Sequence, residues 1–206
     1  MTTTVQIMSD ENLWLRKKAE NPGHSQWYIQ RFRDMAERGA DLAGEARLID
    51  AMVPRGAHVL DAGCGTGRVG GFLAAAGHRV VGVDVDPALI TAAIEDHPSA
   101  TWLVGDLAEL DLPGDGFDVL VCAGNVMTFL APGTRVEVLR RFGRHLAPGG
   151  RAVVGFGAGR GYDFDEFLAD TDTAGLAPEL LLATWDLRPY TIGSDFLVAV
   201  LTCPKG

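Results

Sequence analysis

One stretch of this sequence, residues 59–70, constrains the fold more than any other. An apolar run at residues 57–60 has the length of a buried strand and ends in Asp61. Three glycines follow at alternate positions, Gly63, Gly65 and Gly67. An apolar stripe with helical spacing then begins at Val69. A strand, a glycine-rich turn and a helix N-terminus together let a ligand approach bare backbone, so the sequence predicts a ligand site at this turn.

Short apolar runs alternate with helical patterns around and after this turn. The apolar runs are nearly continuous, as expected of parallel strands that are buried on both faces. Strands are predicted at residues 57–61, 79–83, 100–104, 117–121 and 151–156. Helices are predicted between them at residues 67–76, 87–96 and 133–147, the last stopping at Pro148-Gly149-Gly150. The fold class is therefore α/β, a Rossmann-like three-layer sandwich with a mostly parallel sheet.

The two ends of the chain depart from this alternation. Helices are predicted at residues 10–20, at 25–38 capped by Ser25, at 41–52 capped by Asp41, and at 163–174. The final strands, 179–187 and 196–202, are joined by a turn without a helix and must therefore be antiparallel. We expect a helical cap, residues 1–55, that is part of the same domain as a core of residues 56–206.

Composition narrows the class of partner. The chain has 206 residues, a length typical of one domain. Its net charge of −9 disfavours a nucleic-acid partner, although a local basic patch would escape this whole-chain count, and it favours a small-molecule substrate. Three widely spaced cysteines, no signal-peptide pattern at the N-terminus and no apolar run of about 20 residues indicate a cytoplasmic protein without a membrane span.

The charge of the turn indicates which class of ligand it holds. Dinucleotide-binding proteins place an anionic pyrophosphate there with the pattern G-x-G-x-x-G, which residues 65–70 match. Counted from Gly63, however, the pattern puts Arg68 where the third glycine belongs. The carboxylate of Asp61 would also repel a pyrophosphate, by roughly 1–4 kcal/mol at about 4 Å, and would attract an ammonium group. The turn therefore favours a ligand with a positive end, and an NAD-dependent oxidoreductase is the alternative.

Two further acids follow the next two predicted strands. Asp84 ends the second strand, where a carboxylate can accept both hydroxyls of a ribose, a position that dinucleotide-binding proteins share. Asp106 comes just after the third strand and is placed to accept a hydrogen bond from an adenine amino group. A ligand with an α-amino group, a ribose and an adenine, and without phosphates, is S-adenosylmethionine.

These motifs resemble those of class I S-adenosylmethionine-dependent methyltransferases over about residues 41–203. The matching segments are residues 59–67, 81–84, 105–106, 117–125 and 146–151. The resemblance implies a seven-stranded sheet of order 3-2-1-4-5-7-6 with an antiparallel last strand. It also implies S-adenosylmethionine as cofactor, with S-adenosylhomocysteine as product, and an enzyme that methylates a small molecule.

The resemblance and the charge argument together predict a set of cofactor-binding residues. The turn after the first strand contributes Asp61, Gly63, Cys64, Gly65 and Gly67. The ends of the second and third strands contribute Asp84, Val85, Asp86, Gly105, Asp106 and Leu107. The end of the fourth strand contributes Ala123, Gly124 and Asn125 near the methionine part.

A lid over the substrate or cofactor is predicted from the helix at residues 25–38. Trp27, Tyr28 and Arg31 lie on this helix, and Tyr28 and Arg31 are three residues apart, so that both lie on one face. Arg31 or Arg33 is the candidate to pair with the carboxylate of the cofactor. The alternative for this helix is an amphipathic packing role with solvated arginines. Trp14 and His24 are candidates to line the substrate mouth, or else are packing and turn residues.

Catalytic residues stay unassigned, because methyl transfer needs positioning and water exclusion more than a specific side chain. A general base is required only where the nucleophile arrives protonated, and the sequence shows no evident base. Asn125 is a candidate to hold the nucleophile or the cofactor, or else a turn asparagine. The five histidines show no metal-ligand spacing, so no metal is predicted. A non-catalytic module that binds S-adenosylmethionine or S-adenosylhomocysteine is a further alternative.

Overall fold

A seven-stranded sheet forms the centre of the computed structural model, which describes residues 11–204. Its strand order is β3-β2-β1-β4-β5-β7-β6. The strands are β1 (His58–Ala62), β2 (Arg79–Asp84), β3 (Thr101–Val104), β4 (Phe117–Cys122), β5 (Leu146–Gly157), β6 (Ala177–Leu182) and β7 (Phe196–Thr202). The five neighbouring strands β3, β2, β1, β4 and β5 are parallel, whereas β7 runs antiparallel to both β5 and β6. The Rossmann-like fold and its strand order are therefore confirmed.

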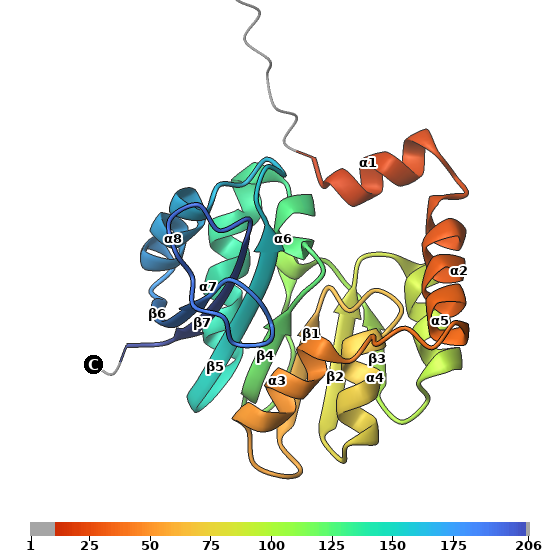
Figure 1. Ribbon diagram of the computed structural model, residues 1–206, viewed down its shortest axis with the longest axis horizontal. Helices are drawn as coiled ribbons and strands as arrows, with labels where there is room; N and C mark the ends of the chain where they lie inside the picture. Colours follow the sequence, from red (N-terminus) through yellow and green to blue (C-terminus); the bar gives the residue numbers. More distant parts are fainter. Residues whose placement is uncertain (1–10, 205–206) are drawn as a thin grey trace, which may run out of the picture.

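Helices cover both faces of this sheet (Figure 1). They are α1 (Leu13–Glu20), α2 (His24–Glu37), α3 (Gly44–Met52), α4 (Arg68–Ala75), α5 (Pro87–Asp96), α6 (Val126–Phe129), α7 (Arg135–His145) and α8 (Phe164–Thr173), with single 3₁₀ turns at Leu107–Glu109 and Pro132–Thr134. Adjacent residues of a strand point to opposite faces, so Val59 packs with α3 and α4 whereas Leu60 packs with α7 and α8. Two hydrophobic layers result, one on each side of the sheet.

The turn between β1 and α4 depends on glycine. Gly67 precedes α4 with a φ of 77°, a left-handed conformation that a side chain disfavours. A Cβ at this position would also come within 2.8 Å of the Trp102 ring. The chain can therefore turn tightly from the edge of the sheet into the helix, and the loop after β1 stays close to the ends of β2 and β3.

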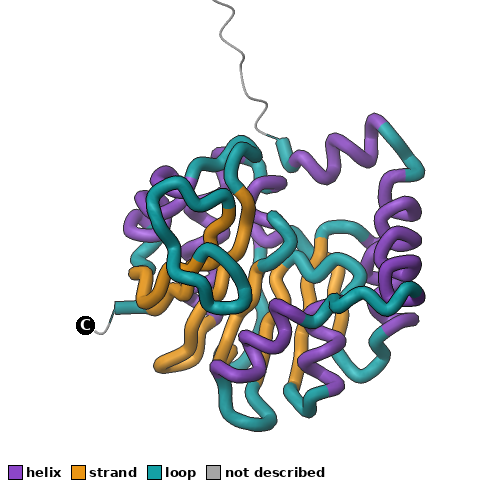
Figure 2. Tube along the Cα trace, in the orientation of Figure 1, coloured by secondary structure: helices purple, strands orange, loops and turns teal. Residues whose placement is uncertain are grey.

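The helices α1 and α2 lie outside the three layers. Both Figure 1 and Figure 2 show them next to the sheet, with α2 beside α5, which it contacts. α1 has no buried residue, and α2 buries only Ser25 and Ile29 among the residues the structure describes. These helices are therefore attached to the core through few buried residues.

Several predicted element boundaries are wrong. α2 begins at His24, and the hydroxyl of Ser25 donates to Asp86 instead of capping the helix. α3 begins at Gly44, and Asp41 accepts a hydrogen bond from the N–H of Ala43 in the preceding turn. Asp10 and the N-terminal segment used to argue against a signal peptide lie outside the described residues.

The largest differences occur near the end of the chain and after β4. β5 starts at Leu146, because the Pro148-Gly149-Gly150 segment continues along β4 with a shift in register instead of standing before the strand. β6 ends at Leu182, and Trp185, predicted to lie in the strand, lies in the loop with its ring against Gly155. The short helix α6 was not predicted. A four-residue helix leaves too little periodicity to recognise.

Candidate functional site

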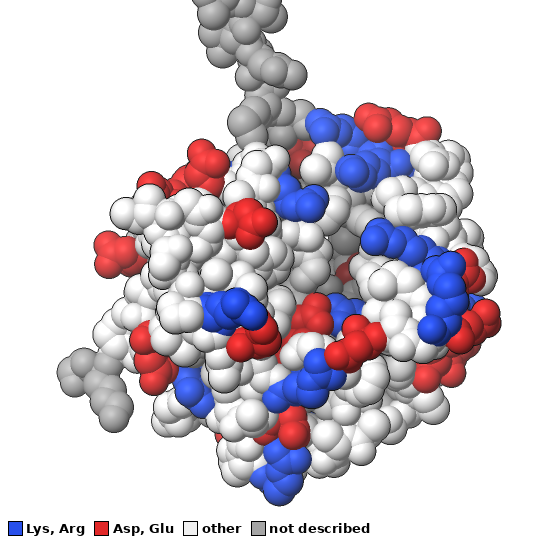
Figure 3. All heavy atoms as spheres, viewed as in Figure 1, with Lys and Arg blue, Asp and Glu red and all other residues white. Residues whose placement is uncertain are grey.

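A cavity of about 440 Å³ lies where β1, β2, β3 and β4 end. Parallel strands of an open α/β sheet bring their carboxyl ends to one edge, where such folds bind ligands. The loops after the strands form one wall of the cavity, and residues of α1, α2 and α6 form the opposite wall. In Figure 3 the surface is hollowed in this region, with Lys and Arg side chains along part of the rim.

Most of the predicted cofactor-binding residues meet in this cavity. The predicted cofactor-binding residues that line it are Gly63, Gly65, Asp84, Val85, Gly105, Asp106, Leu107, Gly124 and Asn125. All three predicted lid residues, Trp27, Tyr28 and Arg31, line it as well, as do Trp14 and His24. Tertiary structure thus brings together four strand ends that are far apart in the sequence.

Asp61 does not line the cavity, which corrects the expectation that its carboxylate faces the ligand. The side chain is buried, and its Oδ2 accepts the backbone N–H of Gly70 at 2.8 Å. Burial raises the pKa of Asp61 to about 7, although the hydrogen bond from Gly70 opposes this rise. Asp61 therefore ties the end of β1 to the first turns of α4, behind the loop that the ligand would touch.

Three more of the predicted residues lie behind the wall of the cavity. Cys64 is buried against Trp102 and Ala93, as expected of a small core thiol, and burial raises its pKa. Gly67 serves the turn into α4, and Ala123 packs in the hydrophobic layer under α3 and α4. All three follow strand ends in sequence, but their packing against the core places them behind the cavity wall.

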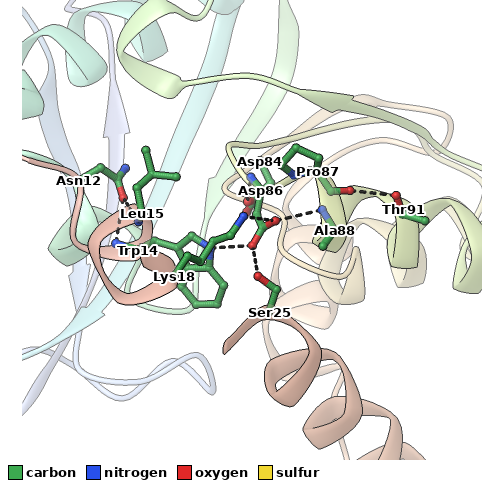
Figure 4. A network of polar contacts seen from close by, with 10 residues as sticks. All are labelled: Asn12, Trp14, Leu15, Lys18, Ser25, Asp84, Asp86, Pro87, Ala88 and Thr91. Carbon is green, nitrogen blue, oxygen red and sulfur yellow. Dashed lines mark hydrogen bonds and ion pairs between the residues drawn. The ribbon is translucent and has the colours of Figure 1, made fainter. Parts of the chain in front are cut away.

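Asp86 is also absent from the cavity lining, and instead joins the N-terminal helices to the core (Figure 4). Its carboxylate is fully buried. It accepts hydrogen bonds from Lys18 Nζ at 2.7 Å, Ser25 Oγ at 2.6 Å and Trp14 Nε1 at 2.9 Å. The same carboxylate caps α5 by accepting the N–H of Ala88 at 3.0 Å. We call these five residues the Asp86 clamp.

The Asp86 clamp depends on a charged carboxylate. Burial raises the pKa of Asp86, but hydrogen bonds from Lys18, Ser25 and Trp14 together lower it below its ordinary value. The carboxylate is therefore ionised at neutral pH, and its buried charge is balanced by Lys18. The family resemblance implied that Asp86 binds the cofactor. The structure assigns it to the attachment of α1 and α2.

Asp84 faces the cavity from the end of β2 and is held by two backbone donors. The N–H of Gly65 donates to its Oδ2, and the N–H of Asp86 donates to its Oδ1, each at 2.9 Å. Burial raises the pKa of Asp84 to about 6, and the two backbone N–H groups only partly offset this effect. Each oxygen of Asp84 can still accept a further hydrogen bond, because a carboxylate has about four lone-pair positions.

Asp106 and its neighbours form the next part of the wall. The Oδ1 of Asp106 accepts the N–H of Ala108 at 2.8 Å and caps the 3₁₀ turn after β3. Val85 and Leu107 also line the cavity and add apolar side chains to it. Apolar side chains together with a carboxylate suit a flat heterocycle with an amino group.

Asn125 follows β4 in a left-handed conformation, with a φ of 68°. Its Oδ1 accepts the N–H of Gly157 at 2.8 Å, which ties the end of β4 to the end of β5. Gly124 beside it also has a positive φ, and a Cβ there would meet no atom within 4 Å. Asparagine tolerates this conformation better than most non-glycine residues, so the turn after β4 suits the residue found there.

An aromatic wall covers the cavity opposite the strand ends. It comprises Trp14, His24, Trp27, Tyr28, Phe32 and Phe129. Tyr28 lies 3.6 Å from where a Cβ of Gly65 would stand, so this glycine leaves room between the loop and α2. Burial raises the pKa of Tyr28 to about 12, and the phenol stays protonated at neutral pH.

Four basic residues also line the cavity, and sequence reasoning identified only Arg31 among them. The others are Lys17, Arg68 and Arg160. Arg68 forms a double hydrogen bond with Glu45 and is structural. Arg33, the alternative partner for the cofactor carboxylate, pairs instead with Glu95 and Asp96 on α5. Lys17 and Arg160 had no recognisable signal in the sequence, because they reach the cavity from separate segments.

Comparison with known proteins identifies the family. A family profile described as a methyltransferase domain matches residues 59–150. A TehB-like S-adenosylmethionine-dependent methyltransferase from Corynebacterium glutamicum is 53% identical, and its crystal structure matches with a TM-score of 0.86 over 89% of this chain and 100% of that one. The chain belongs to the S-adenosylmethionine-dependent methyltransferases. S-adenosylmethionine is the cofactor of this family, and the oxidoreductase alternative finds no support.

Other members of the methyltransferase family match less of the chain. A dTDP-4-amino-2,3,4,6-tetradeoxy-D-glucose N,N-dimethyltransferase from Saccharopolyspora spinosa is 35% identical over 126 residues, 57% of this chain and 49% of that protein. The chain spans about half the length of the curated relatives it matches. An amino pentose methyltransferase from Micromonospora echinaspora, solved with bound S-adenosylmethionine, shares the fold at 21% identity, with a TM-score of 0.65 over 84% of this chain and 95% of that one.

The residues of this methyltransferase fold suit S-adenosylmethionine. Gly63, Gly65, Gly105 and Gly124 present backbone without side chains to the cavity. Asp84 offers its two carboxylate oxygens as acceptors for neighbouring hydroxyls. S-adenosylmethionine has no phosphate group that this carboxylate would repel. Within residues 11–204, no cluster of three or more metal-binding side chains occurs, and no helix is both long and apolar enough to cross a membrane.

Proposed function

We propose that the chain transfers a methyl group from S-adenosylmethionine to a small molecule. One observation carries the proposal: the carboxylate of Asp84, bare glycine backbone and an aromatic wall face one cavity at the ends of four strands. This arrangement combines a site for a ribose with an enclosed space beside it. Family membership supports the same reaction class.

The cofactor is proposed to lie along the strand ends. Asp84 would accept the ribose hydroxyls, and Val85, Asp106 and Leu107 would hold the adenine. Gly63 and Gly65, with Gly124 and Asn125, would surround the methionine part. Arg31 is the proposed partner of its carboxylate, because this residue lines the cavity from α2 and is free of the pairs that hold Arg68 and Arg33.

Methyl transfer requires correct positioning of the reactants and exclusion of water more than a reactive side chain. When bound, S-adenosylmethionine supplies an electrophilic methyl group for in-line displacement. The strand-end loops are proposed to fix its direction, and Trp14, Trp27 and Tyr28 to exclude water from the path of the acceptor. Tyr28 is unsuited as a general base at neutral pH because its phenol is protonated.

The proposed setting is a single domain, residues 1–206, with its cap at residues 1–55, acting in the cytoplasm on a free small molecule and not on nucleic acid. The net charge of −9 supports the last point, because an acidic surface repels a polyphosphate backbone. The S. spinosa relative, by its name, methylates an amino sugar, which supports a small polar acceptor for this chain.

Calorimetry with S-adenosylhomocysteine and with NAD tests the cofactor directly. We expect saturable binding of S-adenosylhomocysteine and none of NAD, and binding of NAD alone would contradict the proposal. Incubation with methyl-labelled S-adenosylmethionine and pools of candidate acceptors then tests the activity. Tight cofactor binding without transfer to any pool would favour the alternative of a non-catalytic binding module.

A further inference from the structure

The cavity holds cations that no carboxylate neutralises. Among the described residues, Lys17, Arg31 and Arg160 line the cavity without a carboxylate within ion-pair distance, whereas Arg68 beside them is paired with Glu45. In a chain with a net charge of −9, such a local excess of positive charge is notable. In Figure 3, Lys and Arg side chains lie along part of the rim of the hollow.

These cations occupy two separate parts of the wall. Arg31 lies on α2, with its guanidinium 5.7 Å from the Trp27 ring centroid. Lys17 and Arg160 flank α6 instead. Lys17 Nζ lies 5.8 Å from the ring centroid of Phe129, the last residue of that helix. Arg160 reaches back toward Gly157, whose N–H is bound by Asn125 at the start of the helix.

The acids of the cavity lie elsewhere. Asp84 and Asp106 follow β2 and β3, whereas Lys17 and Arg160 lie by the segment after β4 and the end of β5. The cavity is therefore polarised, with carboxylates where ribose and adenine are proposed and cations where the methionine part and the acceptor are proposed to meet. S-adenosylmethionine carries one carboxylate, and Arg31 is enough to pair with it. Two cations are left over.

We propose that Lys17 and Arg160 form a subsite for an anionic group, phosphate or carboxylate, on the methyl acceptor. The inference rests on the proposed function and specifies its substrate class. The rings of Trp14 and Phe129 lie beside Lys17, at 5.9 Å from one another. Their planes are nearly perpendicular, at 80°, so the two rings form an apolar corner next to the positive charge. The acceptor is therefore a small acid whose body packs on these rings while its anionic group reaches the two cations.

The test uses the full chain saturated with S-adenosylhomocysteine, after its binding has been measured by calorimetry. Phenyl phosphate, benzoate and neutral benzyl alcohol are then titrated, with tryptophan fluorescence as the readout because Trp14 and Trp27 line the cavity. We expect saturable binding of one or both anions and about tenfold weaker binding of the alcohol. The two anions separate a phosphate-bearing from a carboxylate-bearing acceptor.

Variants then assign the cations. The double variant Lys17→Gln/Arg160→Gln is expected to weaken anion binding about tenfold or more and to change S-adenosylhomocysteine affinity less than about threefold. Arg31→Gln is expected to do the reverse. Arg140→Gln, an exposed arginine on α7, is the matched control and should change neither.

Two results would overturn the subsite. In one, anions bind the double variant as tightly as they bind the unaltered chain. In the other, the double variant loses S-adenosylhomocysteine binding, which would place Lys17 and Arg160 on the cofactor. Absence of S-adenosylhomocysteine binding by the unaltered chain would instead count against the proposed function, so the two failures are distinguishable.

Discussion

At the scale of the residue, Asp84 stands out because its half-buried carboxylate is directed at the cavity. Two backbone N–H groups hold it in place, so its orientation costs little when a ligand arrives. Its neighbour two residues on, Asp86, has the same chemistry and an opposite role. The difference lies in what surrounds each carboxylate, since Asp86 is enclosed by Lys18, Ser25 and Trp14.

Replacing Asp84 tests its direct contact with the cofactor. The Asp84→Ala variant is expected to weaken S-adenosylhomocysteine binding by about 1.5–3 kcal/mol, because a charged hydrogen-bond acceptor is lost. Isothermal titration calorimetry gives the dissociation constant. Asp115→Ala, which removes an exposed acid outside the cavity, should leave it unchanged. An unaltered constant for Asp84→Ala would remove this residue from the site.

The raised pKa of Asp84 makes the same binding depend on pH. The ionised carboxylate can accept two hydroxyls, and burial raises its pKa to about 6, so protonation competes with the ligand as the pH falls through that value. We expect S-adenosylhomocysteine affinity to fall about tenfold from about pH 7 to about pH 5. Asp84→Asn, whose side chain does not titrate, should show weaker binding that varies less. A flat profile for the unaltered chain would contradict the assignment.

At the scale of the element, α1 and α2 are held by one buried group more than by their own packing. α1 buries no residue, and α2 contributes Ile29 to a small cluster with Leu89 and Ala92 of α5. The Asp86 clamp joins both helices to the start of α5, and the backbone N–H of the same residue supports Asp84. Asp86 therefore has two functions: its carboxylate attaches α1 and α2 to the core, and its backbone N–H helps to orient Asp84 in the proposed ribose site.

Removing the clamp is expected to destabilise the chain and loosen the cap. Asp86→Ala leaves the donors of Lys18, Ser25 and Trp14 unpaired, and we expect the free energy of unfolding to fall by about 3 kcal/mol or more. Urea denaturation measures this change.

Arg33→Gln provides the matched control for the clamp. Arg33 forms exposed ion pairs between α2 and α5, two of the elements that the clamp joins, but without a buried charge. The substitution breaks these pairs and is expected to cost at most about 1 kcal/mol. Equal losses for Asp86→Ala and Arg33→Gln would show that the burial of Asp86 contributes nothing special to the attachment of the cap.

At the scale of the whole molecule, stability is expected to be uneven. β1, β4 and β7 lie within the sheet and are buried almost throughout, whereas α1 and α2 cover the cavity with little buried surface of their own. The cavity is bounded on one side by the strand ends and on the other by these two loosely attached helices. A ligand between them contacts both parts and should tie them together.

Hydrogen exchange of the full chain measures this unevenness. We expect amides of β1 and β4 to exchange most slowly, and those of α1 and α2 to exchange fastest among the helices. S-adenosylhomocysteine should slow exchange in α1 and α2 about tenfold or more, because the ligand adds contacts to the cavity wall. α7, on the other side of the sheet, should be unaffected. Protection that spread evenly over all helices would contradict a role of the cap in binding.

Much of the architecture follows from local patterns in the sequence. The positions of the core strands and the antiparallel last pair follow from apolar runs, glycine turns and the absence of a helix before β7, which are properties of neighbouring residues. The strand ends that carry Gly63, Asp84, Asp106 and Asn125 follow in turn, because parallel strands place their carboxyl ends at one edge.

The sequence by itself therefore determined the fold class, the edge of the sheet that carries the site and the acids that follow its strands. Only the tertiary structure decided which acid faces the cavity, burying Asp61 and Asp86 and leaving Asp84 open. It also brought Lys17 and Arg160 to the same wall from segments more than a hundred residues apart. The physical reason is that strand and helix periodicity are local, whereas the direction of a side chain at a strand end depends on the groups from distant segments that enclose it.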